Sequence, residues 1–225
     1  MTNDDDRISA YWSSQDSIKV KRYLTVAERY DRAKPEAVED ARFLDLFVAP
    51  RYAGRSVLDF GAGPGRLVPL WARHGVKLTC AEWSDAFLPN LKARIEKFGG
   101  RAEKLDITRQ HLAETFDLVF STQVLLHIHP RHIDAAMANI RKMAGGEVLL
   151  VTWQSDAPFD GADSPKVQSF NHDYLGLFAR HDLHLTLEME LTFGATKGRG
   201  AVTNKIYLLT VAPPAQPAPT GVAPA

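Results

Sequence analysis

The sequence predicts an α/β protein with a doubly wound, mostly parallel sheet. Strand-like and helix-like segments alternate between about residues 55 and 153, as expected for parallel strands joined by helical crossovers. A glycine-rich turn directly follows the first apolar strand, where such sheets open a crevice. After residue 180, two strand-like runs joined by a glycine-containing loop predict two further strands.

The first strand is expected over Ser56–Phe60, and it runs straight into the turn Gly61-Ala62-Gly63-Pro64-Gly65. Gly61 and Gly63 allow positive φ and a close approach of the backbone to a ligand. The helix that follows, with apolar residues at Leu67, Leu70 and Trp71, directs its N-terminal N–H groups into the same crevice. We therefore expect the turn to cradle a nucleotide-like molecule.

The residues around this turn indicate which nucleotide is bound. A dinucleotide-binding turn has a third glycine where this chain has Arg66, and the Gly-Lys-Ser/Thr ending of a phosphate loop is missing. The pattern D-x-G-x-G-x-G, which starts at Asp59, resembles motif I of the class I S-adenosylmethionine-dependent methyltransferases. An acidic side chain here suits a ligand with a sulfonium and an ammonium, and suits a pyrophosphate poorly.

The remaining elements follow in order. A second strand is expected over Val76–Glu82, a helix over 85–98, a third strand over Arg101–Thr108, a fourth strand from Phe116, a helix over 130–143 and a fifth strand over Glu147–Trp153. A helix over 171–180 precedes strands over Leu183–Thr192 and Asn204–Val211. The leucines of the sixth strand alternate with polar residues, which predicts a strand with one buried face and one solvent-exposed face. The resemblance implies a Rossmann-like, seven-stranded sheet of order 3-2-1-4-5-7-6, with strand 7 antiparallel.

Several residues at the ends of the predicted strands are candidates for holding the cofactor. An acid at the end of the second strand, here Glu82, accepts hydrogen bonds from ribose hydroxyls in nucleotide-binding folds, although it could simply start the next helix. By resemblance, Trp83 lies against the adenine, Asp106 and Ile107 meet its polar edge, and Ser121, Thr122 and Gln123 lie under the methionine portion. The expected S-adenosyl-L-methionine site comprises Asp59, Gly61, Ala62, Gly63, Glu82, Trp83, Asp106, Ile107, Ser121 and Gln123.

Three histidines are candidate general bases for methyl transfer. His127 lies just past the fourth strand, where the transferred methyl should point, and His129 follows on the same turn. His172 lies between the fifth and sixth strands, where the family places acceptor-binding elements. His129 could instead cap the helix that Pro130 opens, and His127 could be a core residue. A metal site from His127, His129 and His132 is conceivable, but no carboxylate or cysteine completes a ligand set with recognisable spacing, so we expect no metal site.

Composition restricts the class of partner. The chain has 225 residues, 45% of them hydrophobic, and a formal net charge of zero. Because the chain has no excess of positive charge, we expect no nucleic-acid partner. The single cysteine, Cys80, fits a cytoplasmic protein, and no apolar run of about 18 residues predicts a membrane span. We expect a small-molecule or sugar acceptor with a hydroxyl or amine; the sequence does not predict an oligomeric state.

The chain divides into three expected parts: a helical N-terminal cap over 1–50, the methyltransferase domain over 51–212 and a disordered Pro/Ala-rich tail over 213–225. Two other classes of function stay open. A nicotinamide-dependent oxidoreductase shares the α/β pattern, and a non-catalytic S-adenosylmethionine-binding protein needs no general base.

Overall fold

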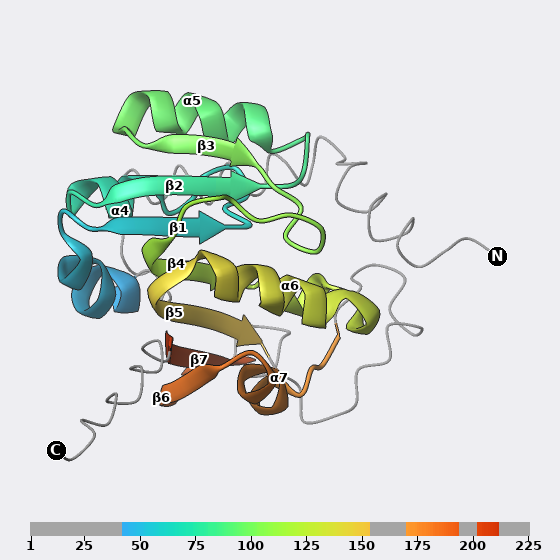
Figure 1. Ribbon diagram of the computed structural model, residues 1–225. Coiled ribbons are helices and arrows are strands. Elements are labelled where there is room, and N and C mark those ends of the chain that lie inside the picture. The colour runs from blue at the N-terminus through green and yellow to red at the C-terminus, as the bar shows by residue number, and fades with distance from the viewer. Residues whose placement is uncertain (1–41, 154–169, 194–201, 212–225) are drawn as a thin grey trace, which may run out of the picture.

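The structure is a computed structural model that describes residues 42–153, 170–193 and 202–211. Seven strands form one sheet in the order β3-β2-β1-β4-β5-β7-β6 (Figure 1). Neighbouring strands are parallel from β3 to β5, and β7 runs antiparallel to both β5 and β6. The predicted doubly wound fold, its strand order and its antiparallel seventh strand are therefore confirmed.

The strands are β1 (Ser56–Phe60), β2 (Lys77–Glu82), β3 (Arg101–Lys104), β4 (Phe116–Thr122), β5 (Ala144–Trp153), β6 (Leu183–Phe193) and β7 (Val202–Val211). The helices are α4 (Val68–Arg73), α5 (Leu88–Phe98), α6 (Pro130–Met143) and α7 (Tyr174–Arg180), with the short turns η2 (Leu44–Val48), η3 (Ala49–Tyr52) and η4 (Leu125–His127).

Each face of the sheet is covered by its own apolar layer. Residues of α6 and α7 pack with alternate residues of β1, β4, β5 and β7 on one face. On the other face, residues of η2, η3, α4 and α5 pack against the intervening residues of the strands. Because side chains alternate between the two faces of a strand, the nearly continuous apolar runs of β1 and β4 supply both layers at once.

Helix α5 and strand β5 begin at other residues than predicted, each for a local reason. Helix α5 begins at Leu88, three residues later than expected, and this start places Pro89 in the first turn, where its missing N–H costs nothing. Strand β5 begins at Ala144, directly after α6, and includes Gly145 and Gly146. A Cβ on Gly146 would lie 2.6 Å from the Asp117 carbonyl oxygen, so the glycines allow β4 and β5 to approach closely.

The prediction that β6 has a single solvent-exposed face is wrong. Leu185 pairs with Leu209, but Leu187 pairs with Leu208, so Thr186 is an extra residue and forms a bulge. The bulge places Leu187 and Met189 on the face of the sheet opposite that of Leu183 and Leu185. Leu185 and Leu187 are each 42% exposed on this edge strand.

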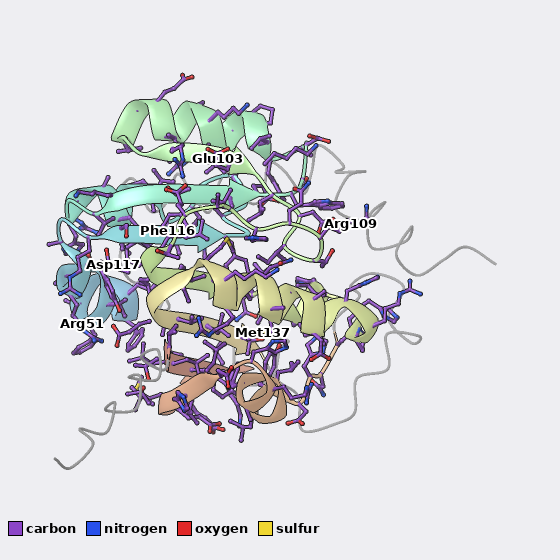
Figure 2. The ribbon with its side chains drawn as sticks, in the orientation of Figure 1. Arg51, Glu103, Arg109, Phe116, Asp117 and Met137 are labelled. Carbon is purple, nitrogen blue, oxygen red and sulfur yellow. The ribbon has the colours of Figure 1, made fainter. Side chains whose placement is uncertain are left out.

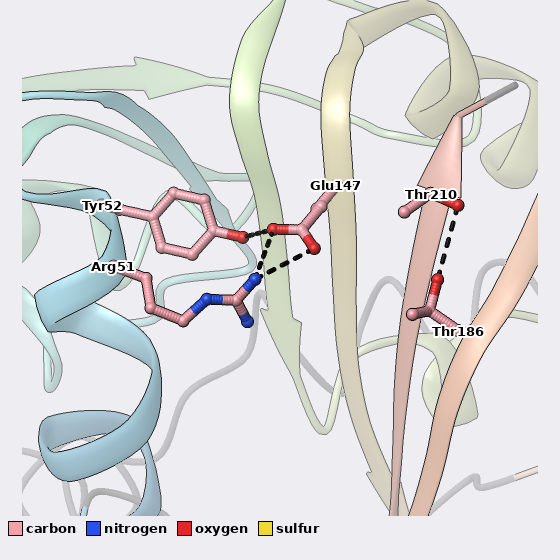
Figure 3. A network of polar contacts seen from close by, with 5 residues as sticks. All are labelled: Arg51, Tyr52, Glu147, Thr186 and Thr210. Carbon is pink, nitrogen blue, oxygen red and sulfur yellow. Dashed lines mark hydrogen bonds and ion pairs between the residues drawn. The ribbon is translucent and has the colours of Figure 1, made fainter. Parts of the chain in front are cut away.

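Polar contacts connect the amino ends of the central strands, at the end of the sheet opposite the glycine turn. Asp117 at the start of β4 accepts hydrogen bonds from the backbone N–H and hydroxyl of Ser56, and Figure 2 shows it at the end of the sheet away from Arg109. The Glu147 carboxylate accepts the Tyr52 hydroxyl and lies 3.2 Å from the Arg51 guanidinium (Figure 3). These contacts attach η3 and β1 to the centre of the sheet.

Parts of the expected domain organisation lie outside the described residues. These parts are residues 1–41 of the predicted cap and the predicted tail over 213–225. Within the described part of the chain, no helix combines the length and the apolar character that crossing a bilayer requires.

Candidate functional site

The glycine turn after β1 has the backbone that the sequence predicts. Gly61 and Gly63 have φ values of 67° and 58°, in the left-handed region that glycine tolerates. The N–H groups of Gly61 and Ala62 both donate to the Ala81 carbonyl, at 2.8 and 3.1 Å, so the turn is fastened to β2. A Cβ on Gly61 would overlap the side chain of Val124, which follows β4. The turn is therefore fixed between the ends of β2 and β4.

Glu82 joins the turn to the end of β2. Its Oε2 accepts the N–H of Gly63 and its Oε1 accepts the N–H of Ser84, each over 2.7 Å. The residue is 7% exposed, and burial raises the pKa of its carboxyl although the N–H donors of Ser84, Gly63 and Trp83 oppose that rise. A carboxylate has about four lone-pair sites, so each oxygen can still accept a hydroxyl.

Asp59 lies beneath the turn at 2% exposure. Its Oδ2 accepts a hydrogen bond of 3.4 Å from the indole Nε1 of Trp71. Burial raises the pKa of the Asp59 carboxyl from 3.8 to about 7; the Trp71 hydrogen bond and the charge of Arg66 oppose the rise, and the charge of Glu82 adds to it. Asp59 is thus a buried acid that any nearby cation would help to ionise.

Asp106 and Ile107 follow β3 at the same edge of the sheet. Oδ1 of Asp106 accepts the backbone N–H and the hydroxyl of Thr108 at 3.0 and 2.7 Å, and its Oδ2 lies 3.5 Å from Nε of Arg109. The Ile107 carbonyl accepts Nδ2 of Asn139 in α6 over 2.8 Å. The loop after β3 is thereby ordered by its own turn and by α6.

The end of β4 contains a contact that the sequence did not predict. Ser121 is buried and donates its hydroxyl to the Phe60 carbonyl over 3.1 Å. Gln123 has a φ of 58° and donates from Nε2 to Oδ1 of Asn204 over 3.0 Å. Asn204 lies at the start of β7, 81 residues away, so no local sequence pattern links it to Gln123.

His127 and His129 lie at the entrance to α6. His127 ends the turn η4, and its backbone N–H donates to the Val124 carbonyl over 2.8 Å. His129 is the N-cap of α6, where its Nδ1 accepts the backbone N–H of Arg131 over 3.2 Å. Its ring also contacts that of Phe170, with centroids 5.1 Å apart. His129 therefore caps α6, as the alternative interpretation of the sequence proposed.

His172 is only 6% exposed. Its Nε2 lies 3.0 Å from the Leu125 carbonyl, and burial lowers the pKa of its ring against the opposing influence of its hydrogen bonds to the backbone of Leu125 and Ile128. A buried ring in these contacts holds η4 in place, and its role as a base stays a prediction.

The geometry of the glycine turn and of the carboxyl groups beside it fits S-adenosylmethionine, the cofactor that the sequence predicts. Apart from Gly63 and its two chain neighbours, no described residue has a heavy atom within 4 Å of the place that a Cβ on Gly63 would take, so the residues described leave room for a ligand to approach the backbone there. Two carboxyl groups, Asp59 and Glu82, flank the turn. No group of three or more His, Cys, Asp or Glu side chains within 42–153, 170–193 and 202–211 could hold a metal ion.

Comparison with known proteins agrees with the resemblance noted in the sequence. Residues 58–146 match the family described as "Methyltransferase domain", and this segment runs from β1 to the beginning of β5. The predicted resemblance is thereby confirmed. No curated protein sequence matches the chain.

Solved structures share the fold at low sequence identity. A TehB-like SAM-dependent methyltransferase from Corynebacterium glutamicum is 19% identical, with a TM-score of 0.62 over 87% of this chain and 100% of its own. Magnesium protoporphyrin IX methyltransferase from Synechocystis PCC 6803 with bound SAH is 14% identical, with a TM-score of 0.60 over 77% and 82%. The glycopeptide N-methyltransferase MtfA with sinefungin is 15% identical, with a TM-score of 0.57 over 74% and 91%.

Proposed function

We propose that this protein, whose residues 58–146 are a methyltransferase domain of the class I fold, transfers a methyl group from S-adenosylmethionine to a small molecule. The observation that carries the proposal is the Glu82 carboxylate at the end of β2, held by the N–H groups of Gly63 and Ser84. Two N–H donors fix its oxygens in space and leave lone pairs for the two hydroxyls of a ribose.

Each end of the cofactor has candidate partners along the carboxyl edge of the sheet. Glu82 and Gly63 would hold the ribose and its neighbourhood, and Trp83, Asp106 and Ile107 would hold the adenine. Asp59, Gly61, Ala62, Ser121 and Gln123 would hold the methionine end, where buried carboxyl groups favour a cation. S-adenosylmethionine supplies a methyl group that is already activated for displacement.

The contribution of the protein to such a transfer is to position the acceptor. Alignment of reacting groups alone can supply roughly 7–11 kcal/mol of the barrier. A hydroxyl or a protonated amine also needs a base, and a well-placed base contributes about 10²–10⁴-fold. Of the three predicted histidines, His127 is our candidate, because it ends η4, the turn that follows β4, where the transferred methyl should point.

The acceptor we propose is a small molecule or a sugar with a hydroxyl or amine. The balanced charge of the chain favours a small acceptor over a nucleic acid. The solved structures with this fold include enzymes named for a porphyrin and a glycopeptide, so the fold itself does not select the acceptor. The single cysteine favours a reducing, cytoplasmic setting.

A non-catalytic cofactor-binding protein is the second candidate, because the hydrogen bonds of His129 and His172 are structural. Calorimetry with S-adenosylhomocysteine and NAD, followed by label transfer from methyl-labelled S-adenosylmethionine to a small-molecule extract, separates the candidates. We expect S-adenosylhomocysteine to bind, NAD not to bind, and label to reach an acceptor more slowly in His127→Ala. Binding without any labelled acceptor supports the non-catalytic role, and binding of NAD alone supports a dehydrogenase.

A further inference from the structure

The turn between β4 and α6 begins with a strained residue. Gln123 has a φ of 58°, and only one other non-glycine residue in the described part of the chain, Asp182, has a positive φ. A side chain with a Cβ occupies this left-handed region at a cost, so the surrounding structure must hold it there. Strained residues of this kind concentrate at ligand sites, where they fix a geometry.

Hydrogen bonds to other described residues hold both the backbone and the side chain of Gln123. Its backbone N–H donates to the Val151 carbonyl of β5 over 2.7 Å, and its Nε2 donates to Oδ1 of Asn204 over 3.0 Å. Asn204 is 6% exposed and pairs with Trp153 in the β5–β7 ladder. The backbone of Asn204 is therefore held in the sheet, and its side-chain contact spans from the end of β4 across β5 to β7.

The position of this contact matters because β7 is antiparallel. Its first residues lie beside the last residues of β5, so Asn204 stands at the carboxyl edge with the glycine turn. The residue after Gln123 is Val124, whose side chain leaves no space for a Cβ on Gly61. The backbone of Gln123 thus sets the path of the segment that packs on the cofactor turn and leads to His127.

We propose that Asn204 is a positioning residue of the site, which holds Gln123 in its left-handed conformation and thereby fixes the segment 123–128 against the glycine turn. The role rests on the proposed function, since this segment would face the methionine end of the cofactor. The hydrogen bond between Gln123 and Asn204 exists in the free protein, so the positioning role can be tested separately from methyl transfer.

Backbone amide exchange of 123–128 in the free protein tests the proposal. Asn204→Leu removes the acceptor, and Gln123→Ala removes the donor while retaining a Cβ; each should speed exchange by roughly 5- to 10-fold, as expected for one lost hydrogen bond. Gln123→Gly also lacks the amide but tolerates positive φ, so exchange should rise by less than about threefold. Gln123→Ala/Asn204→Leu should match the single variants.

Thr210→Val is the matched control on the same strand. Thr210 accepts the Thr186 hydroxyl over 3.4 Å at the other end of β7, so its loss should leave exchange of 123–128 unchanged (Figure 3). In the positioning role, Asn204→Leu should also weaken S-adenosylhomocysteine binding by about 3- to 10-fold, with Thr210→Val within twofold. Where Asn204→Leu does not fold, Gln123→Met removes the donor instead, with the same expectations.

Unchanged exchange in Asn204→Leu overturns the proposal, as does equal acceleration in Gln123→Gly and Gln123→Ala. A Thr210→Val effect of the same size shows general loosening of β7 and overturns it too. If exchange follows the expectation but S-adenosylhomocysteine binds none of the variants or the parent protein, the hydrogen bond orders the segment and the proposed function fails separately.

Discussion

Oε2 of Glu82 accepts the backbone N–H of Gly63 over 2.7 Å, so the end of β2 and the glycine turn after β1 form one hydrogen-bonded unit. The other oxygen accepts Ser84 N–H at the same distance. The acid expected to bind the ribose therefore also organises the turn that would bind the rest of the ligand.

Replacing Glu82 should disable cofactor binding. Glu82→Ala removes the acceptor of two hydroxyls and also leaves Gly63 N–H without its partner. Hydrogen bonds to a charged group contribute about 1.5–3 kcal/mol each, so affinity for S-adenosylhomocysteine in calorimetry should fall at least about tenfold. Asp85→Ala is the control, because that carboxylate is close in sequence but 76% exposed. Equal affinities of parent and Glu82→Ala would show that this acid does not contact the ligand.

Affinity for S-adenosylmethionine should rise with pH because of Asp59. Its pKa is raised to about 7, so the free protein holds a proton there at pH 6 and loses it by pH 8. A cation beside the turn favours the ionised form, and binding should therefore release up to about half a proton at pH 7, more at pH 6 and almost none at pH 8. Calorimetry at pH 6, 7 and 8 in two buffers of different ionisation enthalpy measures this release. Asp59→Asn should bind weakly and without pH dependence; a pH-dependent Asp59→Asn would assign the proton elsewhere.

The ionisation of the Asp59 carboxyl also makes the stability of the folded protein depend on pH. Its pKa in the folded protein lies above the ordinary value of 3.8, so its stabilising effect is complete below about pH 4 and is lost as pH rises through about 7. Asp59→Asn removes this loss, and it should raise the melting temperature at pH 8 while leaving it little changed at pH 4. Thermal unfolding of both proteins at the two pH values is the measurement.

Much of the fold was predictable because it depends on local patterns. Strand β1 and helix α6 have the predicted bounds, since apolar runs, a first-turn proline and flanking glycines are all local signals. The bulge at Thr186 was not predictable: alternation of leucines continues in the sequence, and only pairing with β7 shows the extra residue.

The site was predictable to the same extent. Gly63 and Glu82 follow strands with recognisable patterns, and the structure brings them into contact. Asn204 is isolated in the sequence, and its partnership with Gln123 arises from the antiparallel return of β7. The burial of His172 likewise depends on where the chain packs after β5, which its neighbours in sequence do not determine.

His172 should stabilise η4 in a pH-dependent manner. His172→Phe fills a similar volume but leaves the Leu125 carbonyl without that partner, which should cost about 1–3 kcal/mol. Burial lowers the pKa of His172, so in the parent protein unfolding takes up a proton and stability falls as pH drops below 6.5. The difference between parent and variant in chemical denaturation should therefore shrink toward pH 5. A constant difference from pH 8 to 5 would show that His172 does not titrate on unfolding.

Alanine at Gly61 and at Gly63 should distinguish the effect of the turn on stability from its effect on ligand binding. At Gly61, both the positive φ and the overlap with Val124 oppose a Cβ, so Gly61→Ala should lose about 2–4 kcal/mol and recover part of it when combined with Val124→Ala. At Gly63, only the φ of 58° opposes it, for a loss of about 1 kcal/mol. The new methyl group would instead occupy the open space that the ligand needs. Gly63→Ala should thus bind S-adenosylhomocysteine at least about tenfold more weakly, and parent-like affinity would show that the ligand does not approach the backbone there.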